Sequence, residues 1–181
     1  MPRVSVKRTY LQMADAGELR PAPPPDPAPR IERLEECPPS FFRYLYAEVG
    51  RPYHWTDRLS WTDERVRSHL ADRDVSLWLL SWHGSPAGYF ELKRHEDDSV
   101  EIAYFGLLPE FTGRGWGKYL LTLAALAAWE SGPRRVWLHT CTLDHPAALP
   151  NYVRRGFQPF REETYAADVP AATMVSAAAS G

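Results

Sequence analysis

The sequence predicts an α/β fold, with a mixed and mostly antiparallel sheet of about six to seven strands flanked by about four helices. Short runs of apolar and β-branched residues, bounded by Gly, Pro and Asp, supply the candidate strands. Two of these runs, at residues 75–82 and 86–95, flank the segment HGSP as the arms of a hairpin do. Later runs alternate with helical segments, which indicates crossover connections and helices on both faces of the sheet.

The front half of the chain predicts one strand and two helices, separated by a stiff connector. Residues 3–13 are rich in strand-forming side chains and predict a first strand. Residues 20–30, RPAPPPDPAPR, suit neither a helix nor a central strand, so we expect a connector there rather than a ligand for an SH3-like partner. Residues 38–50 and 62–74 are the two expected helices, and an aromatic-rich loop joins them at residues 51–61.

The back half of the chain predicts further strands that alternate with two helices. Pro150 falls within the second of these helices, where it either kinks the helix or marks its first turn. Gly156 then caps that helix. In chain order we expect a strand at 99–108, a long helix after a glycine turn, a strand at 134–143, a short helix at 145–155 and a strand at 157–167.

Length, charge and cysteine content indicate one soluble domain. A chain of 181 residues, 44% of them hydrophobic, is long enough for a single core, and we expect one domain over 1–170 with a flexible tail at 171–181. A net charge of −2 favours neither nucleic acid nor a membrane as partner. Two cysteines, with no signal peptide or apolar run of about 20 residues, predict a cytoplasmic location. Scattered histidines predict no metal site.

The segment FTGRGWGK, at residues 111–118, predicts an anion site at the start of a helix. Its three glycines allow tight bends and leave backbone N–H groups uncovered, and a helix N-terminus adds unpaired donors. The segment does not fit the Walker pattern, which would require glycine at Thr112 and Ser or Thr at Tyr119. It also departs from the dinucleotide fingerprint, whose third glycine falls on Lys118. A purely structural turn is the alternative.

Two blocks of the sequence match one enzyme family in order and register. The first runs from Thr112 to Gly117 and fits the pattern Gln/Arg-x-x-Gly-x-Gly/Ala, with Thr112 in place of Gln or Arg. The second, HPAALPNYVRRGFQ, fits a late motif in which His145 stands for the common Asn. Together they resemble the GNAT superfamily of acetyl-CoA-dependent N-acyltransferases. The resemblance covers residues 75–160 and implies that the fourth and fifth strands of the family's sheet splay apart.

The resemblance implies acetyl-CoA as co-substrate in the wedge between the splayed strands. The pyrophosphate would rest on the glycine turn, and the pantetheine would pair with strand backbone as an added strand. The thioester carbonyl would accept a hydrogen bond near Phe105, as in an oxyanion site. The implied cofactor-binding residues are Phe105, Leu107, Thr112, Gly113, Arg114, Gly115, Trp116, Gly117, Lys118 and His145.

The resemblance also implies the groups that move protons. An amine must be neutral to attack, and the departing thiolate needs a proton. Tyr152 falls where a tyrosine of the family often donates that proton. Glu101 is the expected catalytic base, on a strand face shared with Ala103 and Phe105, and Glu91 and His139 are rivals. A solvated Glu101 without a catalytic role is the alternative.

The acceptor pocket is implied to include the aromatic loop between the first two helices. Five residues of this loop could hold a flat or cationic acceptor: Tyr53, His54, Trp55, Asp57 and Trp61. The alternative is a loop held in place by its own aromatic rings. Glu91 is a further candidate contact. We expect the acceptor to be a primary amine of a small molecule or peptide, and the family's frequent homodimers leave self-association open. The alternative function is a non-catalytic GNAT-like module that binds CoA or mediates contacts.

Overall fold

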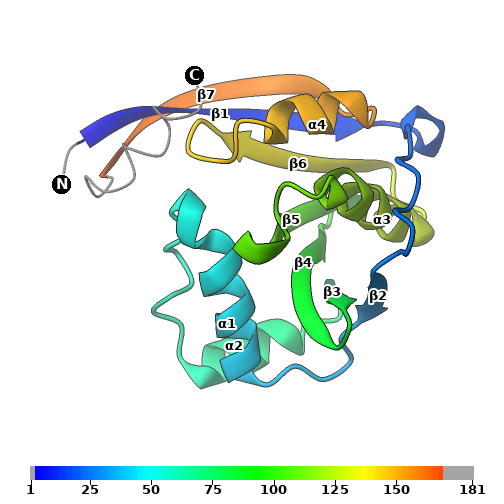
Figure 1. The fold of residues 1–181 in the computed structure, drawn as a ribbon. Coiled ribbons are helices and arrows are strands. Elements are labelled where there is room, and N and C mark those ends of the chain that lie inside the picture. The colour runs from blue at the N-terminus through cyan, green and yellow to red at the C-terminus, as the bar shows by residue number, and fades with distance from the viewer. Residues whose placement is uncertain (1–2, 169–181) are drawn as a thin grey trace.

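The computed structural model describes residues 3–168 as a seven-stranded sheet flanked by four α-helices (Figure 1). The strands lie in the order β2-β3-β4-β5-β6-β1-β7, and the predicted mixed, mostly antiparallel sheet is confirmed. The elements are β1 (Arg3–Met13), β2 (Arg30–Arg33), α1 (Pro39–Gly50), α2 (Asp63–Leu70), β3 (Val75–Trp82), β4 (Ser85–Arg94), β5 (Ser99–Leu107), α3 (Trp116–Glu130), β6 (Arg135–Cys141), α4 (Ala148–Arg154) and β7 (Gln158–Asp168).

The helices cover both faces of the sheet, each over its own core. On one face α3 buries Leu120, Leu121 and Ala124, which recur at helical spacing, and α4 adds Tyr152 to the same cluster. On the other face α1 and α2 pack over β3, β4 and β5, with Phe42 at the centre of a second cluster. The predicted layers on both sides of the sheet are therefore confirmed.

The N-terminal strand is built into the far half of the sheet. β1 pairs antiparallel with β6 on one side and with β7 on the other, so it lies between the last two strands of the chain (Figure 1). The proline-rich connector then crosses to β2 at the opposite edge of the sheet. Its backbone is tied to the helices on the way, because the N–H of Arg20 donates to the Arg155 carbonyl and that of Ala22 to the Thr122 hydroxyl, both at 2.9 Å.

Gly156 permits that crossing and also caps α4, as predicted. Its φ of 107° lies in the region that favours glycine. A Cβ at this position would lie 2.0 Å from the carbonyl oxygen of Glu18, in the segment that leads into the connector. No side chain larger than hydrogen fits there without moving the backbone.

The sheet opens between β5 and β6. These two strands are the only parallel neighbours in the described sheet, and they pair over just three positions, from Ser99 with Arg135 to Glu101 with Trp137. Beyond Glu101 the edge of β5 has no strand partner on this side within residues 3–168. The fourth and fifth predicted strands correspond to β5 and β6, so the predicted splay is confirmed. It exposes backbone N–H and C=O groups along one wall of the split.

Some local details differ from the sequence prediction. The sequence analysis missed β2, a four-residue edge strand, RIER, in which one isoleucine stands among charged residues. Pro150 occupies the first turn of α4, which is the second of its two predicted roles. The other helices and strands agree with the expected ranges and are mostly shorter at their ends. The expected tail at 171–181 lies outside the described residues.

Candidate active site

The glycine turn after β5 presents a row of unpaired backbone donors. Gly113 and Gly115 have φ values of 76° and 75°, and Gly115 caps α3 without any side-chain hydrogen bond. No acceptor in the described part of the chain receives a hydrogen bond from the N–H groups of residues 113–118. A Cβ added at Gly113 or Gly117 would meet nothing within 4 Å. Free amides at a helix N-terminus, with open space before them, suit phosphate oxygens.

Some side chains of this turn are exposed cations, and others pack in the core or form hydrogen bonds within the protein. Arg114 and Lys118 are exposed, and the Arg114 guanidinium lies 4.9 and 5.3 Å from the centroids of two aromatic rings of the turn. The Trp116 ring is buried in the core, so only its backbone N–H faces outward. The hydroxyl and N–H of Thr112 both donate to the Pro109 carbonyl, at 2.8 and 3.3 Å. Thr112 therefore holds the turn and offers no free donor.

The wall of the split formed by β5 contains a bulge. The pairing with β4 skips Ala103, which is the extra residue in β5. The insertion reverses the alternation of side chains, so Ile102 and Phe105 both pack toward α3 whereas Tyr104 packs toward α1. The prediction that Glu101 shares a face with Phe105 is wrong for this reason. The Phe105 side chain packs against the core but is only partly buried, and its backbone lies on the wall of the split.

Leu107, like Phe105, packs its side chain against the core. It lies at the end of β5, and its side chain is partly buried against the core under α3. Its backbone pairs with Gly88 of β4. Both residues predicted as contacts on β5 therefore point partly buried side chains toward the core under α3.

Tyr152 of α4 lies against the wall formed by β5. Its ring is 7% exposed and packs edge-on against Phe105 and Phe157, with centroid distances of 6.2 and 6.4 Å. Burial raises the pKa of the Tyr152 phenol well above its ordinary value, so the hydroxyl keeps its proton. No described residue forms a hydrogen bond with that hydroxyl. The phenol is thus a protonated donor that has no acceptor among residues 3–168.

A second aromatic contact joins the two sides of the split. Tyr53, at the end of the short 3-10 segment after α1, packs edge-on against His145, which precedes α4, at a centroid distance of 6.4 Å. The Nδ1 atom of His145 accepts a hydrogen bond from the Ala147 N–H at 3.1 Å, which fixes the ring at the start of α4. The fold therefore brings together a predicted substrate-binding residue and a predicted cofactor-binding residue.

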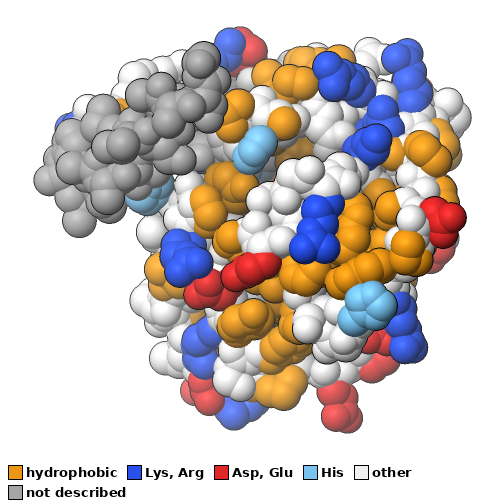
Figure 2. All heavy atoms as spheres, in the orientation of Figure 1, with side chains coloured by type: hydrophobic (Ala, Val, Ile, Leu, Met, Phe, Trp, Pro, Cys, Tyr) orange, Lys and Arg blue, Asp and Glu red, His pale blue; other side chains and the backbone are white. Residues whose placement is uncertain are grey.

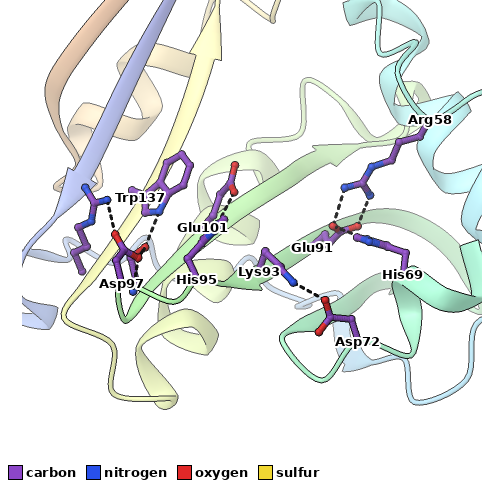
Figure 3. A network of polar contacts seen from close by, with 11 residues as sticks. Arg58, His69, Asp72, Glu91, Lys93, His95, Asp97, Glu101 and Trp137 are labelled. Carbon is purple, nitrogen blue, oxygen red and sulfur yellow. Dashed lines mark hydrogen bonds and ion pairs between the residues drawn. The ribbon is translucent and has the colours of Figure 1, made fainter. Parts of the chain in front are cut away.

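Glu101 lies at the closed end of the split. It is the last residue of β5 that pairs with β6, and its side chain is 16% exposed. Its Oε2 atom is 2.8 Å from Nε2 of the more exposed His95 (Figure 3). The ring of Trp137 lies 5.5 Å from that of His95. A carboxylate hydrogen-bonded to an imidazole that reaches solvent is a suitable path for a proton.

A buried ionic network ties the aromatic loop to β4 (Figure 3). Arg58 donates to both oxygens of Glu91, at 2.6 and 3.0 Å, and Nε2 of His69 lies 3.0 Å from one of them. Burial alone would raise the pKa of Glu91, but the hydrogen bonds from His69 and Arg58 hold it below the ordinary value. Glu91 is fully buried, and Arg58 is 8% exposed.

This network corrects the prediction that Glu91 contacts the substrate. A carboxylate with no exposed surface and with both oxygens occupied cannot reach a ligand in this structure. Its role is to fix Arg58 and, through it, the loop. The sequence analysis missed Arg58 and His69, which lie 33 and 22 residues away from Glu91 along the chain. No local pattern in the sequence signals a pairing of that length.

Asp57, which precedes Arg58, belongs to a different arrangement. It is exposed, and its two oxygens accept hydrogen bonds from the phenols of Tyr46 and Tyr104, at 2.5 and 2.6 Å. The ring of Trp55 lies 5.0 Å from that of Tyr104 and 5.7 Å from that of Tyr46. The predicted contact Trp55 therefore stands beside an anchored carboxylate, among aromatic rings from α1 and β5.

Residues 3–168 contain no group of three or more His, Cys, Asp or Glu side chains that could hold a metal ion. None of the helices described is both long and apolar enough to cross a membrane. Figure 2 shows apolar side chains in patches between charged groups of both signs on the face viewed.

The split sheet and the unpaired amides at the start of α3 define a class of protein, an α/β domain with an open strand edge beside a helix N-terminus. A family model described as "Acetyltransferase (GNAT) family" matches residues 28–157. The chain belongs to this family, and the resemblance inferred from its two motifs is confirmed.

Individual relatives agree with this assignment. A mycothiol acetyltransferase from Corynebacterium efficiens is 29% identical over 112 residues, which are 58% of this chain and 36% of that protein. A GCN5-related N-acetyltransferase from Kribbella flavida has a similar structure, with a TM-score of 0.65 at 19% identity over 91% of this chain and 58% of the other. A spermidine N-acetyltransferase from Vibrio cholerae, solved with CoA and spermine, gives 0.58 at 18% identity over 72% and 79%. The chain spans about a third of the length of the curated relative.

Proposed function

We propose that this domain transfers an acetyl group from acetyl-CoA to a primary amine of a small molecule or peptide, by direct attack in a ternary complex. The observation that carries the proposal is the run of free backbone amides at residues 113–118, beside an unpaired strand edge in a split sheet. The first N–H groups of a helix have no partner within the helix, and the glycines here leave them uncovered, so an anionic ligand can supply the acceptors.

The residues present fit the acyl donor. The amides of the turn, with the charges of Arg114 and Lys118, would receive the diphosphate. The edge of β5 beyond Glu101 would pair with the amides of the pantetheine arm. The bulge at Ala103 interrupts the ladder with β4 at the same level of the strand, and an N–H that it releases would stabilise negative charge on the thioester oxygen. Acetyl-CoA supplies the reactive thioester. The residues of the chain would position that thioester and transfer the protons.

Two groups of the chain would move the protons. The amine nitrogen forms a C–N bond to the acetyl carbon, and the C–S bond to CoA breaks. Tyr152 would donate its proton to the departing sulfur, since its phenol is protonated and has no acceptor in the described part of the chain. Glu101, with His95, would take the proton that the amine must lose and pass it to solvent. Proton exchange with water then restores the Tyr152 phenol.

A panel of amines tests the proposed function directly. The protein is mixed with acetyl-CoA and mono-, di- and polyamines, aminoglycosides or short peptides, and the release of free thiol is followed. We expect release that depends on both the protein and one class of amine. Tight CoA binding without thiol release from any amine would instead favour the non-catalytic module. A thermal-shift comparison of CoA, ATP and NAD adds the ligand preference, because a ligand of the native state raises its melting temperature.

A further inference from the structure

We infer that Asp57 anchors a second positive charge on the acceptor, so that the preferred substrates are amines that carry another cationic group, such as short diamines. The inference rests on the proposed function for the identity of the ligand as an acceptor. It goes further because it assigns a binding residue and a class of substrate, and neither follows from the family fold.

Asp57 is an exposed anion whose orientation is fixed. Burial acts to raise the pKa of Asp57, but the hydrogen bonds from Tyr104 and Tyr46 outweigh it and hold the pKa below the ordinary value. Each of its oxygens accepts a single phenolic hydrogen bond, so lone pairs remain on both. The residue makes no ion pair with any described side chain. It is therefore a preorganised acceptor for an external cation.

The neighbouring cation does not satisfy Asp57. Arg58 lies next to it in the chain, but both terminal nitrogens of its guanidinium donate to Glu91. The face of that guanidinium rests on the ring of Tyr104, 4.0 Å from the centroid. Arg58 is thus compensated by a different carboxylate. The loop therefore pairs its cation, Arg58, with the buried Glu91 of β4 and presents its own anion, Asp57, to solvent.

The walls around Asp57 also suit an ammonium group. Tyr46, Trp55 and Tyr104 form a cluster with centroid distances of 5.0 to 5.7 Å. Tyr46 is buried and Tyr104 already carries the Arg58 guanidinium on one face, so the half-buried Trp55 is the ring that can attract a further cation. Tyr104 comes from β5 immediately after the bulge at Ala103, so the cluster lies beside the wall of the split. From the same loop, Tyr53 contacts His145 on the far side of the split. Asp57 therefore lies on the acceptor side of the proposed reaction centre.

Asp57 is a binding group rather than the base. Two hydrogen bonds stabilise its ionised form, which makes it a weak proton acceptor. Loss of its charge should weaken the binding of dications while leaving the pH profile of kcat in place. This separates Asp57 from Glu101, whose loss would change that profile.

Binding and turnover of two matched amines test the inference. The ligands are 1,4-diaminobutane and 1-aminobutane, which differ by one ammonium group, and affinities are measured by calorimetry on the intact chain. We expect the wild type to bind the diamine about 10-fold or more tightly than the monoamine, and Asp57→Asn to remove that preference. Glu64→Gln, which removes one negative charge from an exposed position of α2, is the control and should keep it. Melting temperatures establish that the variants are folded.

The outcomes separate the inference from the proposed function. Equal wild-type affinity for both amines, or a preference that survives in Asp57→Asn, would overturn the inference even if acetylation is observed. A diamine preference that requires Asp57 would support the site even if no amine is acetylated, in which case the proposed function fails alone. The wild type gives a further check without any variant, since its preference should fall as salt is raised from 0.05 to about 0.5 M.

Discussion

Two polar regions of this domain are built in opposite ways. Around Glu91, the charged groups have protein partners: Arg58 and His69 meet the carboxylate, Glu91 and Arg58 are buried, and only His69 keeps some exposed surface. At residues 113–118, a run of backbone donors has no protein partner at all within the described chain. In the first region the protein itself supplies the hydrogen-bond partners. In the second, the backbone donors are left for solvent or a ligand.

The difference shows how structural and binding groups are distinguished. Both regions looked alike in the sequence, as polar residues close to a predicted cleft, and Glu91 was a candidate substrate contact. Satisfaction of hydrogen bonds separates them, because a buried charge must be paired to be tolerated, whereas a preorganised binding site must leave its donors free. Perturbing the first region should therefore cost stability, and perturbing the second should cost ligand affinity or rate.

Replacement of Glu91 should give the largest effect on folding. In Glu91→Gln the Arg58 guanidinium remains buried without its counter-charge, and we expect a loss of about 3–5 kcal/mol in the free energy of unfolding. Urea unfolding followed by fluorescence measures it. Glu101→Gln is the matched control: that side chain is partly exposed and pairs only with His95, so the loss should be below about 1 kcal/mol. Equal losses in the two variants would contradict the description of Glu91 as the counter-charge that keeps a buried Arg58 paired.

Replacement of Tyr152 should lower the rate with little change in stability or CoA affinity. The phenol has no hydrogen bond to lose in the described structure, so Tyr152→Phe keeps the packing and removes only the proton donor. We expect kcat to fall about 100-fold. Tyr53→Phe, on the other side of the split, is the control and should retain most of the rate. A Tyr152→Phe enzyme with unchanged kcat would exclude the phenol as the acid.

The glycine turn offers a test in which stability and binding change in opposite directions. Gly117 lies in the first turn of α3, where alanine is a better helix former and a Cβ meets nothing within 4 Å. Gly117→Ala should therefore stabilise the fold by about 0.5–1 kcal/mol. The same methyl group would occupy space in front of the donors, and we expect CoA to bind about 10-fold more weakly. Pantetheine, which lacks the diphosphate, is the control ligand and should bind equally to both forms.

Sequence patterns predicted what depends on neighbours in the chain and failed for distant pairings. The glycine turn, the hairpin at β3 and β4, and the cap at Gly156 are local, and each was predicted. The bulge at Ala103 was missed because it appears only in the register of β5 with β4. The position of β1 between β6 and β7 depends likewise on pairing across the whole chain, and no periodicity reports it.

The smallest of the expected effects is a pH dependence of stability. Of the two regions, only the network around Glu91 should show it. The pKa of Glu91 in the folded protein lies below its ordinary value of 4.5, so the unfolded chain takes up a proton at higher pH than the folded one does. The stability that this group contributes is therefore complete above the unfolded value and is lost as pH falls through the folded value. Melting temperatures measured between pH 6 and about pH 3 should fall less steeply in Glu91→Gln than in the wild type. Parallel curves would show that the Glu91 carboxylate is not ionised in the folded protein, and the description of Arg58 as a compensated cation would then have to be abandoned.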